Sequence, residues 1–192
     1  MSLRRLLLAV GVALVVAGCS NTVGEPSSPD TSASSASQSG AAPRVPAALD
    51  VSSIQSNACA AISDSKRSSL GYGAGKPRAG AYGPSCTFQI ADEPLNQMDL
   101  TVFTANKNGL SDIYDTKGNN DYFEPTTIEG YPAVYAASLD HRSKGKCGLF
   151  VAVTDQLTVN LLSQFDRGAG AQAPCPVVAK AAASVIQTLK GD

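Results

Sequence analysis

The clearest hydrophobic pattern in this sequence lies near its C-terminal end, over residues 176–189. Apolar side chains recur there at intervals of three and four positions, at Val178, Ala181, Ala182, Val185 and Leu189. Such spacing gathers them on one face of an α-helix. Pro176 suits the first helical turn, and Gly191 suits the position after the last turn. The pattern predicts a helix that packs one face against a core.

Alternation of apolar and polar residues predicts strands in the middle of the chain. Residues 86–90 and 98–105 alternate in this way around a turn, and together they predict a β-hairpin. Residues 147–153 and 157–164 flank a tight turn and predict a second hairpin. Consecutive hairpins imply a mostly antiparallel sheet.

The remaining segments of the same region have weaker patterns. Residues 127–139 predict one further strand, kinked at Gly130 and Pro132. Residues 53–70 predict helical structure, and residues 71–84 are rich in Gly and Pro and predict a loop. The predicted fold class is therefore α+β, with a mostly antiparallel sheet of about five strands and the N- and C-terminal helices packed on one face.

The N-terminal end has the composition of an export signal. Arg4 and Arg5 precede a short apolar run over residues 6–16, which is the pattern of a secretory signal peptide. The run is shorter than the about 20 apolar residues that a membrane-spanning helix needs. Residues 14–19, with the sequence LVVAGC, resemble the bacterial lipobox, in which the cysteine receives a diacylglyceryl group and becomes the N-terminus after cleavage. The alternative is an ordinary signal peptide in which Cys19 has no special role.

These features divide the chain into three parts. Residues 1–18 are predicted to be a lipoprotein signal peptide. Residues 19–48 contain the lipidated Cys19 and a Ser-, Ala- and Pro-rich segment that buries too little apolar surface to fold, so they predict a disordered linker. Residues 49–192 have the length of a single globular domain. We expect the protein to be lipid-anchored at the extracytoplasmic face of the cell membrane.

Four cysteines remain after the anchor, namely Cys59, Cys86, Cys147 and Cys175. An even number in an exported domain predicts two disulfide bonds, and four cysteines allow three connectivities. Cys147 begins one predicted strand and Cys175 precedes the last helix at the same end of the sheet, which favours Cys147–Cys175 and leaves Cys59–Cys86. Because the cysteines are widely spaced and the chain has one histidine, zinc is disfavoured.

Charge and composition also exclude some partners and chemistries. The formal net charge is −1 and no long basic segment occurs, which disfavours nucleic acid as a partner. His141 beside Asp140 could belong to a catalytic triad, but the chain lacks a G-x-S-x-G motif, so a solvated turn is the preferred interpretation. Asp92 and Glu93 are neighbours on a turn, a poor arrangement for two glycosidase carboxylates.

Three further patterns each have two possible interpretations, one functional and one purely structural. Residues 71–77 contain the Gly residues of a phosphate-binding loop but Pro77 follows the lysine, where Ser or Thr is needed. Residues 115–124 are rich in oxygen ligands but do not match a calcium-binding loop, so we predict a polar loop. Six aromatic residues fall mostly in predicted loops, where they could be binding anchors or could cover the core. These are Tyr72, Tyr82, Tyr114, Tyr122, Phe123 and Tyr131.

Six short motifs in order resemble one known family. They are Asn57-Ala58-Cys59, PSCTF at 84–88, Gly109-Leu110 with Tyr114, EGYPA at 129–133, Cys147 at the start of a hairpin strand and Cys175 at the start of the last helix. In this order and spacing they are similar to the actinobacterial cell-envelope lipoproteins of the domain of unknown function 3558. That family often has Asp-Pro-Cys at the first motif and Trp at the position of Phe88. The resemblance implies an exported α+β domain with paired cysteines and no known reaction.

From these observations we expect a membrane-anchored, non-enzymatic binding or sensing module without catalytic residues, metal or cofactor. Its partners would be the membrane, through the lipid, and an envelope lipid, a small ligand or a protein. The alternatives are a cell-envelope hydrolase and a structural interaction protein. A deep apolar cavity would favour a lipid or small-molecule ligand, and a shallow surface with an aromatic patch would favour a protein partner.

Overall fold

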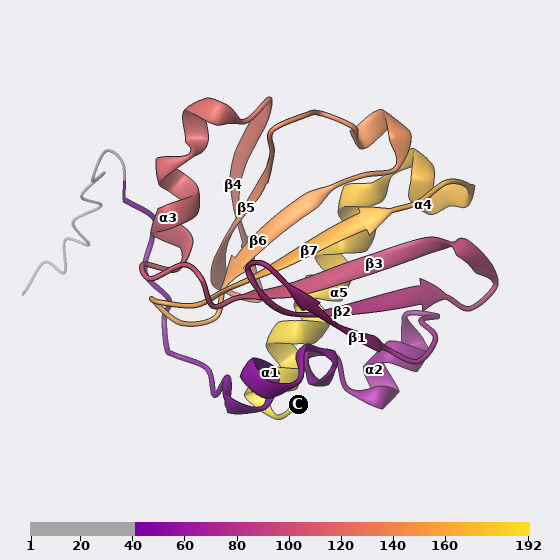
Figure 1. The fold of residues 1–192 in the computed structure, drawn as a ribbon, viewed down its shortest axis with the longest axis horizontal. Helices are drawn as coiled ribbons and strands as arrows, with labels where there is room; N and C mark the ends of the chain where they lie inside the picture. The colour runs from indigo at the N-terminus through magenta and orange to yellow at the C-terminus, as the bar shows by residue number, and fades with distance from the viewer. Residues whose placement is uncertain (1–40) are drawn as a thin grey trace, which may run out of the picture. The chain divides into compact units, whose positions relative to one another are not determined.

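The computed structural model describes residues 41–192, and a seven-stranded antiparallel sheet organises them (Figure 1). The order across the sheet is β1-β2-β3-β7-β6-β5-β4. The strands are β1 (Lys76–Gly80), β2 (Gly83–Ile90), β3 (Glu93–Phe103), β4 (Tyr122–Ile128), β5 (Tyr131–Ala137), β6 (Gly148–Ala152) and β7 (Thr158–Gln164). The predicted α+β class and antiparallel sheet are confirmed. The predicted signal peptide, Cys19 and residues 20–40 of the predicted linker lie outside the described residues.

The prediction of five strands is wrong for two reasons: one strand has no apolar alternation, and a hairpin was predicted as a single strand. β1 falls in the predicted loop, and all its residues are exposed at the edge of the sheet, so no apolar alternation marks it. The predicted kinked strand over 127–139 is instead the hairpin of β4 and β5. Glu129 and Gly130 join them with φ angles of 50° and 82°, the left-handed pair that a tight hairpin turn requires.

The helical segments are mostly short. They are α1 (Ser52–Ser56), η1 (Ala58–Ala61), α2 (Asp64–Ser69), α3 (Leu110–Asp115), η2 (Lys117–Asn119), η3 (Arg142–Lys144), α4 (Gly168–Gln172) and α5 (Pro174–Lys190), where η is a 3-10 turn. The helical structure predicted over 53–70 is present as three short pieces, and the last of them, α2, follows Ser63 and ends just before Gly71. The side chain of Asn57 accepts a hydrogen bond from the Cys59 N–H at 3.1 Å and begins η1 where α1 ends.

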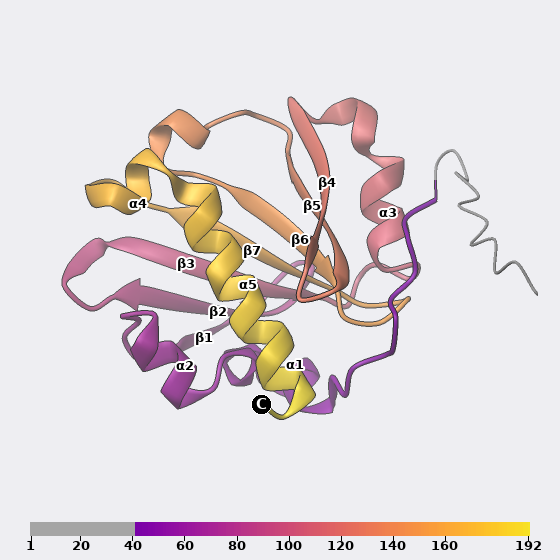
Figure 2. The same ribbon diagram turned by 180° about the vertical axis from the view of Figure 1, so that it is seen from behind.

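The long helix α5 lies across one face of the sheet (Figure 2). It begins two residues before the predicted start, at Pro174, and ends at Lys190, just before Gly191, whose φ of 86° suits a C-terminal cap. Its predicted apolar face is buried: Val178, Ala181, Ala182 and Val185 join one core with Leu149, Val151 and Leu161 of the sheet and Ile54 and Ala58 of the N-terminal segments. Within residues 41–192, no helix has both the length and the apolar character needed to cross a membrane.

Two disulfide bonds join the ends of these elements. Cys59–Cys86 connects η1 to β2, and Cys147–Cys175 connects the start of β6 to the first turn of α5. These are the two pairs that the predicted topology favoured. Each closes a loop with a sequence separation of 27 or 28 residues.

The opposite face of the sheet is covered only in part. The short helix α3 packs Leu110 and Ile113 against Val134, Ala136 and Ala152 of β5 and β6. No helix lies over β2, β3 and β7 on this side in the described structure (Figure 1). The chain enters the domain beside α3, where Arg44 forms an ion pair of 2.6 Å with Asp155 in the turn between β6 and β7.

Candidate functional site

The uncovered part of the sheet presents polar and aromatic side chains that lie side by side on neighbouring strands. Along β3, Met98, Leu100 and Val102 are buried in the core, and the alternate residues point to the other side. We call the surface made by these alternate residues the open face. From the strand register it contains Lys76, Arg78, Ser85, Thr87, Gln89, Gln97, Asp99, Thr101, Phe103, Phe150, Thr158, Asn160, Leu162 and Gln164. Of these, Thr87 and Thr158 are buried beneath their neighbours.

Asp99 lies at the centre of a hydrogen-bonded cluster on this face. Its Oδ1 accepts a hydrogen bond of 2.5 Å from the Thr87 hydroxyl across the β2–β3 pair. Its Oδ2 accepts from the Gln97 amide at 3.1 Å and from the Gln164 amide. The three donors are neutral, and the nearest cation is the Arg78 guanidinium at 4.0 Å, which is 65% exposed. The carboxylate is therefore held in position by neutral groups, with one exposed cation beside it.

Several polar atoms of the open face are not used within the described residues. The side-chain oxygens of Gln97, Gln164 and Asn160 have no hydrogen-bond partner there, although each of these side chains donates through its nitrogen. The guanidinium of Arg78 has five N–H donors, and most of them lie outside its contact with Asp99 and are available to a ligand. The face therefore offers acceptors and donors to a molecule above it.

Three aromatic rings form a continuous stack at one end of the open face. The ring of Tyr82 lies parallel to that of Phe103, with centroids 5.0 Å apart and planes 6° apart. Phe103 meets Phe150 edge to face at 5.5 Å. Tyr82 remains 59% exposed, whereas the two phenylalanines are half-buried. These geometries are the favourable ones for aromatic pairs.

A glycine allows this stack to form. Gly83 follows Tyr82 of the β1–β2 turn, begins β2 and has a φ of 142°. A Cβ atom at this position would lie 2.1 Å from the Val102 carbonyl oxygen. Because Gly83 lacks a side chain, the turn approaches β3 closely enough for the Tyr82 carbonyl to accept a hydrogen bond of 3.1 Å from the Ala105 N–H.

A comparison with protein families identifies the group to which this sequence belongs. The model of DUF3558, described as a protein of unknown function, matches residues 14–188. The match includes both disulfide pairs and every strand of the sheet. The chain belongs to the DUF3558 family. No curated protein and no solved structure matches it.

In this DUF3558 protein, most of the loop aromatics cover the core rather than serve as exposed anchors. Tyr72, Tyr122 and Tyr131 are buried, and burial raises the pKa of the Tyr72 hydroxyl to about 12. Tyr114 and Phe123 pack against each other edge to face at 4.9 Å. Of the aromatic residues considered from the sequence, Tyr82 alone is exposed. Its partners Phe103 and Phe150 lie on predicted strands, where aromatic residues are ordinary and give no functional signal.

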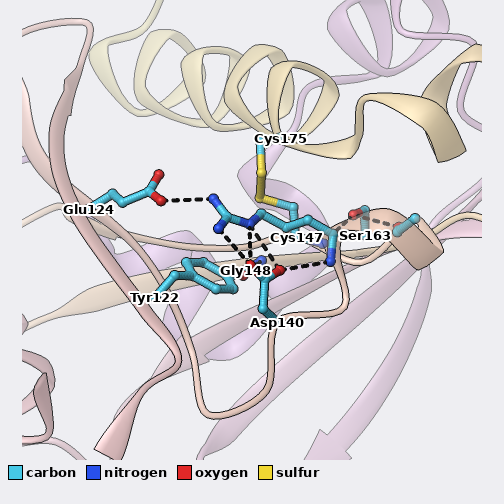
Figure 3. The surroundings of a disulfide bond; sticks show 9 residues. Tyr122, Glu124, Asp140, Cys147, Gly148, Ser163 and Cys175 are labelled. Carbon is cyan, nitrogen blue, oxygen red and sulfur yellow. Dashed lines mark hydrogen bonds and ion pairs between the residues drawn. A yellow bond between two sulfur atoms is a disulfide. The ribbon is translucent and has the colours of Figure 1, made fainter. Parts of the chain in front are cut away.

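The residues around His141 form a structural ion-pair cluster near the Cys147–Cys175 disulfide (Figure 3). The Asp140 carboxylate accepts hydrogen bonds from Arg142, at 3.0 Å from Nε and 2.7 Å from Nη2. Arg142 also donates to Glu124 at 2.8 Å, and its guanidinium lies 4.2 Å from the centre of the Tyr122 ring. Asp140 therefore pairs with Arg142. His141 itself lies in the turn before η3 and is half-buried, so it is less exposed than the solvated turn residue that the sequence predicted.

This cluster predicts a pH dependence of stability. Hydrogen bonds from Arg142 lower the pKa of the Asp140 carboxyl from 3.8 to about 2. A depressed folded-state pKa stabilises the protein above the unfolded value and loses its effect as the pH falls through the folded value. We expect Asp140→Asn to lower the unfolding midpoint in urea at pH 5, and the difference from the wild type to shrink between pH 4 and pH 2. A difference that stays constant to pH 2 would contradict the assignment.

The other sequence hypotheses occupy separate places in the fold. Glu93 accepts a hydrogen bond from the buried Asn96 amide, while Asp92 is exposed. Residues 71–77 run from a turn into β1, and residues 115–124 are distributed over the end of α3, η2 and the start of β4. Over residues 41–192, no group of three or more His, Cys, Asp or Glu side chains is arranged to hold a metal ion.

Two hollows that open to solvent lie at the surface of residues 41–192. One of about 720 Å³ lies between η1 and the β1–β2 edge, lined by Asn57, Pro77 and Pro84. Another of about 380 Å³ lies beside the entering chain at Arg44 and Asp155. The space between α5 and the sheet is filled by the fully buried core side chains.

Proposed function

We propose that this DUF3558 protein is a non-enzymatic binding module, tethered by a lipid on Cys19 to the extracytoplasmic face of the cell membrane, and that it binds its ligand on the open face. One observation carries the proposal: the open face combines unused hydrogen-bonding atoms with an exposed aromatic ring. Antiparallel sheets often have one solvated face. A solvated face alone does not require the Tyr82–Phe103–Phe150 stack, which places apolar surface in water.

The scaffold under the open face supports this role. Apart from Tyr82 in the β1–β2 turn, its side chains lie on strands, and Cys86 of the Cys59–Cys86 disulfide immediately precedes Thr87 in β2. Groups fixed in this way lose little conformational freedom when a ligand binds. A site of this kind suits ligand binding, because each side chain that is already fixed adds no further entropy cost when the ligand binds.

The tether is supported by the sequence of residues 14–19 and by the span of the family match, which begins at residue 14 and includes Cys19. Two acyl chains anchor a protein stably to a membrane. Changing Cys19 to alanine should leave the precursor uncleaved or release the protein from the detergent phase of a membrane fractionation. A Cys19→Ala protein that matures and partitions like the wild type would exclude the lipid anchor.

The hydrolase alternative has a direct test at His141. No side-chain hydrogen bond to His141 occurs within the described residues, and its neighbour Asp140 is occupied by Arg142. We expect His141→Ala to change the free energy of unfolding by less than about 0.5 kcal/mol and to leave ligand binding intact. A hydrolytic activity of the purified protein that disappears in His141→Ala would replace binding by catalysis as the proposed function.

Nuclear magnetic resonance can locate the ligand site while the ligand is still unidentified. The full chain, labelled with nitrogen-15 in detergent micelles, would be titrated with aqueous and organic-solvent extracts of cell envelopes. We expect amide shifts confined to β1, β2, β3 and β7, the β1–β2 turn with Tyr82, and Phe150 of β6, with α5 unchanged as the internal control. Shifts centred elsewhere, or none with either extract, would contradict binding on the open face. If the protein instead serves only as a structural interaction partner of another protein, shifts would occur only with the proteins isolated from the aqueous extract.

A further inference from the structure

We propose that the ligand of the open face is an uncharged glycan, bound as a short oligosaccharide along β3. This inference rests on the proposed binding function and adds the chemical class of the ligand. It is carried by the combination of two features on one surface, the Asp99 cluster and the Tyr82–Phe103–Phe150 stack. The two lie four residues apart along β3, which corresponds to about 13 Å at the rise of a strand.

The hydrogen-bonding groups of the open face complement hydroxyl groups. A hydroxyl both donates and accepts, so it can satisfy an amide oxygen and a guanidinium at once. The face presents the free oxygens of Gln97, Gln164 and Asn160 beside the free N–H groups of Arg78. Asp99, already fixed by three donors, can accept from one further hydroxyl. A polyhydroxylated ring would use all of these groups together.

The aromatic stack complements the apolar face of a sugar ring. A sugar ring has a face of C–H groups that packs against an aromatic ring. Tyr82 is 59% exposed and its ring is held parallel to Phe103 at 5.0 Å, so it presents a flat surface whose position is fixed. Tyrosine loses little conformational entropy when it is covered, because it has only two side-chain torsions.

The size of the open face favours a small ligand over a protein. With a rise of about 3.4 Å per residue and a strand spacing of about 4.8 Å, the five strands of the face over the length from Gln97 to Phe103 cover on the order of 500 Å². A stable protein interface buries about 800 Å² on each partner. From the sequence we expected a shallow surface with an aromatic patch to favour a protein partner. The small area of this face argues instead against a protein. A short oligosaccharide fits this area.

Charge and shape disfavour the other ligand classes. Lys76 is bonded to the Gln89 side chain at 2.7 Å, and Arg78 lies beside the Asp99 carboxylate. A neutral amide oxygen leaves the charge of Lys76 in place, whereas the Asp99 carboxylate offsets that of Arg78. The face therefore has about one net positive charge and lacks the cluster of cations that binds a phosphorylated ligand best. An acyl chain needs a deep apolar cavity, and the space behind the sheet is filled by core side chains.

Calorimetric titration of the full chain in detergent, with neutral oligosaccharides of glucose, mannose, galactose, arabinose or N-acetylglucosamine, tests the inference. At least one probe should bind. Tyr82→Ala should weaken it about tenfold, the effect of losing one aromatic contact. Arg78→Gln should weaken it at least severalfold, since a charged hydrogen bond is lost. Both residues are largely exposed, so both variants should fold.

Two control variants sharpen this test. Tyr82→Phe keeps the ring and should bind within about twofold of the wild type. Leu139→Ala removes a side chain of equal exposure, 60%, in the loop after β5 and should change nothing. Equal binding by the wild type and Tyr82→Ala would overturn the glycan inference. If no oligosaccharide binds but envelope extracts still shift the amides of β2, β3 and β7, the glycan is excluded and the binding function stands. If a protein fraction alone causes those shifts, the ligand is a protein.

Discussion

Replacing Gly145 by alanine is expected to lower the free energy of unfolding by at least about 3 kcal/mol. Gly145 has a φ of 73°, and an added Cβ atom would lie 1.9 Å from the Phe165 carbonyl oxygen. The overlap is with backbone, which cannot turn aside as a side chain can. The Gly145 carbonyl also accepts hydrogen bonds of 3.1 Å from the Phe165 N–H and the Ser163 hydroxyl. Any shift that relieves the overlap breaks these contacts.

A second glycine separates the steric overlap from the cost of the backbone conformation. Gly191 has a φ of 86°, and no atom lies within 4 Å of a Cβ added there. Gly191→Ala should therefore cost only about 1–2 kcal/mol, the left-handed penalty alone. Urea unfolding of both variants, followed by far-ultraviolet circular dichroism, measures the difference. Equal losses in the two variants would show that the loop around Gly145 relaxes freely.

Removing either disulfide bond should lower the free energy of unfolding by about 3–4 kcal/mol. Changing both cysteines of a pair to alanine avoids a free thiol and a buried hydroxyl. The two loops have nearly equal sequence separations of 27 and 28 residues, so restriction of the unfolded chain predicts similar losses for the two pairs. Urea unfolding of the two double variants tests this equality.

The two disulfides should differ in their effect on the open face. Cys86 precedes Thr87, whose hydroxyl bonds Asp99, and Gly75 packs so closely over the bridge that an added Cβ would lie 2.7 Å from the Cys86 sulfur. Loss of Cys59–Cys86 should therefore speed amide exchange at Thr87 and Asp99 and weaken ligand binding. Loss of Cys147–Cys175 should leave both unchanged at temperatures where the fold persists. Wild-type exchange rates at Thr87 and Asp99 in the variant without Cys59–Cys86 would show that this bridge does not support the face.

Local periodicity was sufficient for the elements whose neighbours along the chain are also their neighbours in space. The stripe of Val178, Ala181 and Val185 predicted α5, and the alternating runs predicted the hairpins β2–β3 and β6–β7. The family was also predictable, because its motifs are short stretches around Cys59, Cys86 and similar landmarks. The edge strand β1 was missed because an edge strand with both faces in water has no hydrophobic alternation.

The sequence by itself determined the α+β class, the two hairpins, the terminal helix and the favoured cysteine pairs, because each depends on patterns within one segment or on the ends of neighbouring segments. Only the tertiary structure decided the open face. Asp99 and Gln164 meet because β3 pairs with β7, which lies more than fifty residues away along the chain, with Gln97 opposite Gln164. Phe103 and Phe150 meet through the same pairing and that of β6 with β7. Such register is set by burial of the opposite face, so the polar face it assembles leaves no signal in any one strand.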